Sequence, residues 1–219
     1  MTFIIENSLV LFCITFGVMQ LTSLIMKRQE ANFCTNDGTV RAFSIFDLEF
    51  AANAKEIVNL ITGIFNLPPA KQHTSVKALK SQLYIDFLFM PAAYGSIFLL
   101  CIKTSDKLTT HAGKTVFLIL AWVQVLAWLC DIIENIYLLT KISPKPKGSG
   151  PFAFALYQLN EWFKWGISLT GAVCGISAML YFWLIGSYSK DSLLYLIIII
   201  AEILVIGIAG KMLSKKAKQ

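Results

Sequence analysis

Acidic residues inside long apolar runs are the part of this sequence that could do chemistry. Asp131, Glu134 and Asn135 lie in the segment DIIEN, at spacings of three and four residues that put them on one face of a helix. A carboxylate in a bilayer costs about 3 kcal/mol or more, so such residues usually face a bundle interior or a water-filled cavity. The segment therefore predicts a polar site that could bind a proton, a metal ion or an organic cation.

A second apolar run carries a similar polar face. Tyr157, Glu161 and Lys164 follow one another at spacings of four and three residues, so a helix would align them. Lys164 is the only basic residue well inside the apolar runs, whereas five acidic residues lie there: Asp86, Asp131, Glu134, Glu161 and Glu202. The excess of acid predicts either protonated carboxyl groups or a balancing cation from outside the helices.

Helices that cross a bilayer are needed to position these residues. The 219-residue chain has 56% apolar and 15% charged residues and a mean hydropathy of +0.65, which is outside the range of ordinary soluble domains. Runs near the ~20 residues that a transmembrane helix requires occur at about 3–26, 82–102, 115–139, 152–185 and 192–210. The fourth run is longer than necessary, so its span could begin near 152 or near 163.

The segment between the first two spans contains a further helix pattern. Asn36, Asp37 and Gly38 mark a turn, and Ser44 followed by Asp47 has the spacing of a capping box. The pattern predicts an amphipathic helix over about 44–65, whose apolar face contains Phe46, Phe50, Ile57, Ile61 and Ile64 and whose polar stripe contains Glu49, Asn53 and Glu56. The expected fold class is an all-α integral membrane protein: one domain over 1–219, with about five transmembrane helices and one amphipathic interfacial helix.

The basic residues predict the orientation of the spans. In a five-span arrangement, fourteen lysines and arginines lie on the side of the C-terminus and four on the side of the N-terminus. Positive residues accumulate in cytoplasmic loops, so we expect a cell-membrane protein with its N-terminus outside and its C-terminus in the cytoplasm. Basic clusters beside the bilayer also explain the net charge of +6, and we expect no nucleic-acid partner.

Depth along the helices suggests that the acidic residues share one level. At about 1.5 Å per residue, Asp86 lies ~7 Å inside its span, Glu134 ~8 Å, and Asp131 and Glu202 ~12–13 Å, all measured from the cytoplasmic end. We therefore predict a pocket in the cytoplasmic half of the bilayer. Its primary candidate residues are Asp86, Asp131, Glu134, Asn135, Glu161 and Lys164, and its secondary candidates are Glu49, Asn53, Glu202 and Tyr157.

Two segments carry a combination of motifs that occurs together elsewhere. They are KSQLYIDFLFMPAAYG at 80–95 and LAWLCDIIENIYLL at 126–139, with D-F-x-F and a following tyrosine in one span and D-x-x-E-N in the next. The pair resembles a group of small, uncharacterised bacterial polytopic membrane proteins. The resemblance implies that Asp86, Asp131, Glu134 and Asn135 form a shared polar set.

Three function classes fit these features. The first is binding or passage of a small cation, which the excess of acid favours. The second is an enzyme acting on a lipid headgroup or ester, although the expected motifs are missing and both histidines, His73 and His111, fall in connections. The third is a structural subunit with a membrane-protein partner or a second copy of itself. The sequence assigns no catalytic residue, metal or cofactor.

Overall fold

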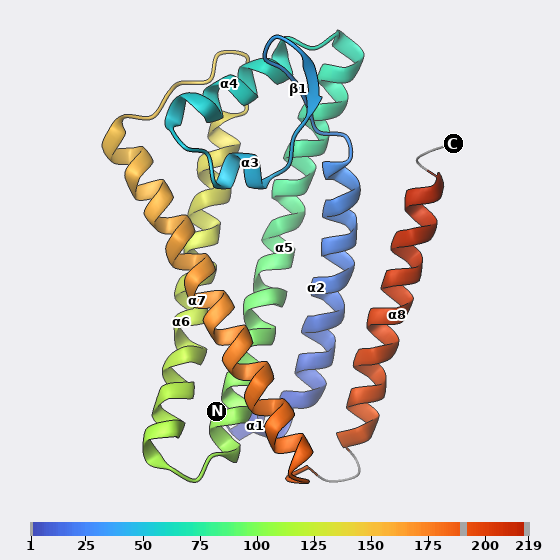
Figure 1. The fold of residues 1–219 in the computed structure, drawn as a ribbon, viewed down its shortest axis with the longest axis vertical. Coiled ribbons are helices and arrows are strands. Elements are labelled where there is room, and N and C mark those ends of the chain that lie inside the picture. Colours follow the sequence, from blue (N-terminus) through green and yellow to red (C-terminus); the bar gives the residue numbers. More distant parts are fainter. Residues whose placement is uncertain (1, 189–191, 217–219) are drawn as a thin grey trace. The chain divides into compact units, whose positions relative to one another are not determined.

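Long helices dominate the computed structural model, which describes residues 2–188 and 192–216 (Figure 1). In chain order the elements are α1 (Thr2–Glu6), α2 (Ser8–Glu30), β1 (Cys34–Asn36), β2 (Val40–Ala42), α3 (Phe46–Glu49), α4 (Ala54–Phe65), α5 (Pro69–Lys107), α6 (His111–Lys141), α7 (Pro151–Leu184) and α8 (Ser192–Lys216). Within the described ranges, five helices are long and apolar enough to cross a membrane: α2, α5, α6, α7 and α8. The prediction of an all-α, multi-pass membrane protein is confirmed.

The chain forms two compact units, and helices α2, α5, α6 and α7 each contribute to both. Unit 1 comprises Met1–Leu24, Leu88–Trp128 and Trp165–Gln219, and unit 2 comprises Ile25–Phe87 and Leu129–Lys164. All six primary candidate residues belong to unit 2.

Unit 1 is held together by close helix contacts and a few polar bonds. Ser96 on α5 donates a hydrogen bond to Thr15 on α2 at 2.9 Å, and Gln124 on α6 donates to the carbonyl of Ile167 on α7 at 3.3 Å. Gly171 on α7 allows this approach, because an added Cβ would lie 2.4 Å from the Gln124 amide nitrogen. Small residues and interhelical hydrogen bonds of this kind are typical of helix packing in bilayers.

Unit 2 contains a segment outside the long helices, residues 31–66, which we call the cap. Strands β1 and β2 pair antiparallel with Thr35 opposite Arg41, and they turn through Gly38, whose φ of +120° favours glycine. Buried cap side chains, among them Leu48 and Ile64, pack in one core with Leu79 and Leu83 of α5. The cap therefore covers the unit 2 portions of the long helices (Figure 1).

The prediction of a single amphipathic helix over 44–65 is wrong. The structure has α3 and α4 instead, separated by an extended Asn53 that caps α4: its side chain accepts a hydrogen bond from the Glu56 backbone N–H. The Glu56 side chain in turn accepts a hydrogen bond from the Ala52 N–H at 2.7 Å, one residue before the N-cap, and the helix restarts there. The break leaves Phe46 and Phe50 exposed, while Ile57, Ile61 and Ile64 are buried.

Several helices are longer than the spans predicted for them. α5 begins at Pro69 rather than near 82, because its first turns bury Ala78 and Leu79 in the core of unit 2. α7 begins at Pro151, so the earlier of the two predicted starts is correct for the helix. Proline suits both positions, since the first residue of a helix needs no backbone N–H donor. In the first span a turn at Asn7 separates α1 from α2.

Candidate functional site

The primary candidates come from three helices of unit 2. Asp86 lies on α5, Asp131, Glu134 and Asn135 on α6, and Glu161 and Lys164 on α7. Asp131, Glu134, Asn135, Glu161 and Lys164 are all buried, with exposed fractions of 1–7%. The helical spacing read from the sequence therefore does place these side chains inside the protein.

Lys164 is the centre of the arrangement. Its Nζ lies 2.9 Å from Asp131 Oδ1 and 3.0 Å from Glu161 Oε2, and it also contacts Glu134 Oε2. Glu161 is one turn before Lys164 on the same helix, whereas Asp131 and Glu134 reach it from α6. The ion pairs with Asp131 and Glu134 therefore connect α7 to α6 through a single buried ammonium group.

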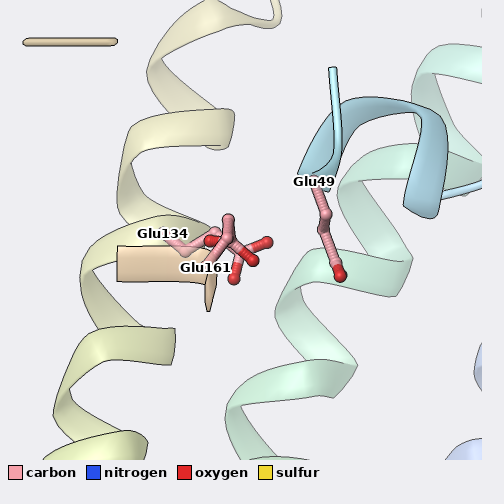
Figure 2. A group of neighbouring side chains, drawn as sticks. All are labelled: Glu49, Glu134 and Glu161. Atoms are coloured by element: carbon pink, nitrogen blue, oxygen red, sulfur yellow. The ribbon is translucent and has the colours of Figure 1, made fainter. Parts of the chain in front are cut away.

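A carboxylate from the cap completes the group. Glu49, the last residue of α3, has an oxygen within 4.8 Å of oxygens from both Glu134 and Glu161. Figure 2 shows the Glu49 side chain extending from α3 beside those of Glu134 and Glu161, which overlap in this view. We refer to Glu49, Asp131, Glu134 and Glu161, together with Lys164, as the carboxylate cluster.

Two hydrogen bonds from α7 hold Glu49 in place. The Tyr157 hydroxyl donates to the Leu48 carbonyl at 3.1 Å, and the Gln158 amide donates to the Ala51 carbonyl at 3.2 Å. Both acceptors are backbone carbonyls within two residues of Glu49. Tyr157, predicted as a secondary site residue, therefore positions the cap segment that carries the acid.

Asp86 is joined to the same face of α6 through Asn135. The Asn135 amide donates to Asp86 Oδ2 at 2.7 Å and to the Leu83 carbonyl at 3.3 Å. On the neighbouring side, the Asn160 amide of α7 donates to the Cys130 carbonyl of α6 at 2.9 Å. These bonds fix the alignment of α5, α6 and α7 around the cluster.

The cluster has more negative than positive charge. Its four carboxylates are matched by one ammonium group, so the fully ionised cluster has a formal charge of −3. Glu161 is 1% exposed, and its Oε1 atom receives no hydrogen bond within the described part of the chain. Removing a charge from water costs several kcal/mol when its partners are incomplete. The arrangement is therefore suited to accept a proton or a further cation.

Two of the secondary candidates have other positions. Asn53 is the N-cap of α4, so its side-chain oxygen is committed to the Glu56 backbone. Glu202 belongs to unit 1, where it lies against Gly17 of α2. Glu49 was predicted only as a secondary candidate. The apolar residues beside it, Leu48 and Phe50 to Ala52, could have indicated from the sequence that it is buried.

A surface hollow of about 510 Å³ lies elsewhere in unit 2. It is formed by α4 and the connection before α7, and is lined by Ala54, Lys55, Val58, Asn59, Gly148, Ser149 and Gly150. None of these residues belongs to the carboxylate cluster. The hollow therefore does not define the candidate site.

Comparison of the chain with protein-family models, with curated proteins and with solved structures finds no match.

Proposed function

We propose that this membrane protein binds a small cation at the carboxylate cluster of unit 2. The observation that carries the proposal is the approach of Glu49, Glu134 and Glu161, whose oxygens lie within 4.8 Å of one another. Like charges at this distance repel strongly in a buried setting, and one lysine offsets only part of that repulsion. A cation supplied from outside would remove the remainder.

The position of the cluster is consistent with either storage or passage of the cation. Its residues lie on helices that can cross a membrane, and Glu49 comes from the cap outside those helices. From the fourteen basic residues on one side, we propose that the N-terminus is outside and that the cap faces the cytoplasm. A cation would then reach the cluster from the cytoplasmic side.

Thermal unfolding of the purified protein in detergent tests the binding. The melting temperature is measured with sodium, potassium, magnesium, calcium, manganese and choline chlorides at equal ionic strength. A ligand at 100 times its Kd stabilises the folded state by about 2.7 kcal/mol. For a chain of this size that corresponds to a rise of roughly 5–10 °C.

The same measurement on two variants shows whether the cluster is responsible. Glu134→Gln removes one cluster charge with little change of shape, and Glu202→Gln removes a carboxylate from a spanning helix of unit 1 as the matched control. The proposal requires the response to one cation to fall in the first variant and persist in the second. The proposal fails if no cation changes the melting temperature in a way that depends on Glu134.

Flux measurements then separate binding from passage. Wild-type protein and the Glu134→Gln variant are placed in liposomes, and the responding cation is followed into the lumen. Cation uptake by the wild type but not by the variant supports passage through the cluster. Equal background uptake by the wild type and the variant supports a binding site without transport.

A second candidate function is that of a structural subunit. The ion pairs of Lys164 with acids on both α6 and α7 favour it, because they bridge two helices without any external ligand. In this case the protein would be extracted by mild detergent together with a stoichiometric membrane-protein partner or as an oligomer, and no added cation would change its melting temperature.

A further inference from the structure

We propose that the cation is a hard divalent metal ion, such as Mg²⁺, Mn²⁺ or Ca²⁺, ligated by Glu49, Glu134 and Glu161. This inference rests on the proposed function and goes beyond it by naming the chemical class of the ligand and the atoms that hold it.

The spacing of the oxygens suits a single ion. Oxygen ligands lie ~2.0–2.1 Å from Mg²⁺ and ~2.3–2.6 Å from Ca²⁺, so two ligands on opposite sides of one ion are roughly 4–5 Å apart. One oxygen from each of the three glutamates lies within 4.8 Å of the others. Small side-chain rotations would close these distances around an ion.

The donor set selects the kind of metal. All three ligands are carboxylates, and the group contains neither a histidine nor a cysteine. Oxygen donors suit magnesium, calcium and manganese, whereas zinc and copper sites usually contain imidazole or thiolate. The formal charge of the cluster is also better offset by a divalent than by a monovalent ion.

An unsatisfied atom in the cluster provides a second observation that points to a ligand. Glu161 is 1% exposed, and its Oε1 is buried without a hydrogen-bond partner in the described residues. Buried carboxylate oxygens are normally hydrogen-bonded, so an oxygen in this state needs an explanation. A metal ion between Glu161 and the other two glutamates would satisfy it.

Lys164 occupies part of this space and would act as an internal competitor. Its ammonium contacts Glu134 and Glu161, both of which are proposed ligands, but it also lies 2.9 Å from Asp131, which is not. When an ion binds, Lys164 would keep its bond to Asp131 and give up the other two. Loss of the lysine charge is therefore expected to tighten metal binding rather than weaken it.

Manganese binding to the full-length protein in detergent tests the inference. Electron paramagnetic resonance follows the loss of the free Mn²⁺ signal, and competition with Mg²⁺ and Ca²⁺ measures their affinities. We expect one Mn²⁺ per chain. Glu49→Gln, Glu134→Gln and Glu161→Gln should each weaken binding at least about ten-fold, since even residues that support metal ligands contribute ~10–100-fold. Glu202→Gln should bind as the wild type does.

Lys164→Met provides a test that misfolding cannot imitate, because the expected result is a gain in manganese affinity. Manganese should bind this variant several-fold more tightly than the wild type. Unchanged Mn²⁺ affinity in both Glu134→Gln and Glu161→Gln, or weaker binding by a folded Lys164→Met protein, would overturn the inference.

The two proposals can fail separately. If the melting temperature responds through Glu134 to sodium, potassium or choline but not to any divalent ion, the metal inference is wrong and the proposed function stands. If no cation acts through Glu134, both are wrong.

Discussion

Glu49, at the end of a short helix in the cap, has a carboxylate oxygen within 4.8 Å of one from Glu161, a buried residue of α7. The pair joins a segment outside the long apolar helices to an acid buried within them. A cation between these oxygens would therefore attach the cap to α7. Cation binding would stabilise the folded cap, and a folded cap would be needed for full cation affinity.

Glu49→Gln tests this link. Without added cation, the variant should melt at the same temperature as the wild type or slightly higher, because one of four neighbouring charges is gone. Relief of ~1 kcal/mol of repulsion would raise the melting temperature by about 2–4 °C. With the responding cation, its further stabilisation should be much smaller than that of the wild type. An undiminished response would exclude Glu49 as a ligand.

Lys164→Met should destabilise the protein when no cation is present. Removal of one partner from a buried ion pair typically costs about 3–5 kcal/mol, because the remaining charge is left uncompensated. The loss should be recovered by the cation that binds the cluster, as measured by thermal unfolding with and without a chelator. Lys103→Met serves as the control, since its pairing with Asp106 is long, at 3.9 Å, and the aspartate is exposed. Equal losses in the two variants would contradict a special role for Lys164.

Asn135→Ala should destabilise unit 2 by about 1–3 kcal/mol, because the Asp86 carboxylate would lose a partly buried hydrogen bond of 2.7 Å. Denaturant unfolding of N135A, D86A and the double variant gives the coupling energy of the pair. We expect ~0.5–3 kcal/mol. Additive effects of the two substitutions would mean that the bond contributes nothing to stability.

Gly63→Ala should loosen the hairpin from α4. An added Cβ would lie 2.1 Å from Thr35 Oγ1 and 3.0 Å from the Asn36 backbone nitrogen, so the strand would have to move. Overpacking of this kind typically costs about 1–3 kcal/mol. Limited proteolysis should cut the cap faster in this variant than in Gly207→Ala, where no atom lies within 4 Å of the added Cβ. Equal cleavage rates would count against the close approach.

The pKa of Asp37 should lie below its ordinary value of 3.8, because the Arg41 guanidinium donates hydrogen bonds to its carboxylate. A lowered pKa in the folded state means that this pair stabilises the hairpin above the ordinary value and ceases to do so as the pH falls through the lowered one. Titration followed by NMR should show the pKa of Asp37 returning to its usual range in Arg41→Gln. Identical titration curves would disprove the pairing.

The sequence by itself determined the five apolar helices and the polar faces of α6 and α7. These features depend on local spacing: residues three and four apart share a helix face wherever the helix lies, and a long apolar run can satisfy its backbone in a bilayer as a helix. Asp131, Glu134 and Asn135, and likewise Glu161 and Lys164, could therefore be singled out without any knowledge of tertiary contacts.

The tertiary structure decided which charges meet. The N-cap at Asn53 interrupts the predicted amphipathic helix, and hydrogen bonds from Tyr157 and Gln158 then hold the preceding turn where Glu49 reaches the other acids. Lys164 could be matched with Glu161 from their spacing alone, but its bonds to Asp131 and Glu134 depend on how α6 packs against α7. Such contacts join residues far apart in the chain, and helical periodicity contains no information about them.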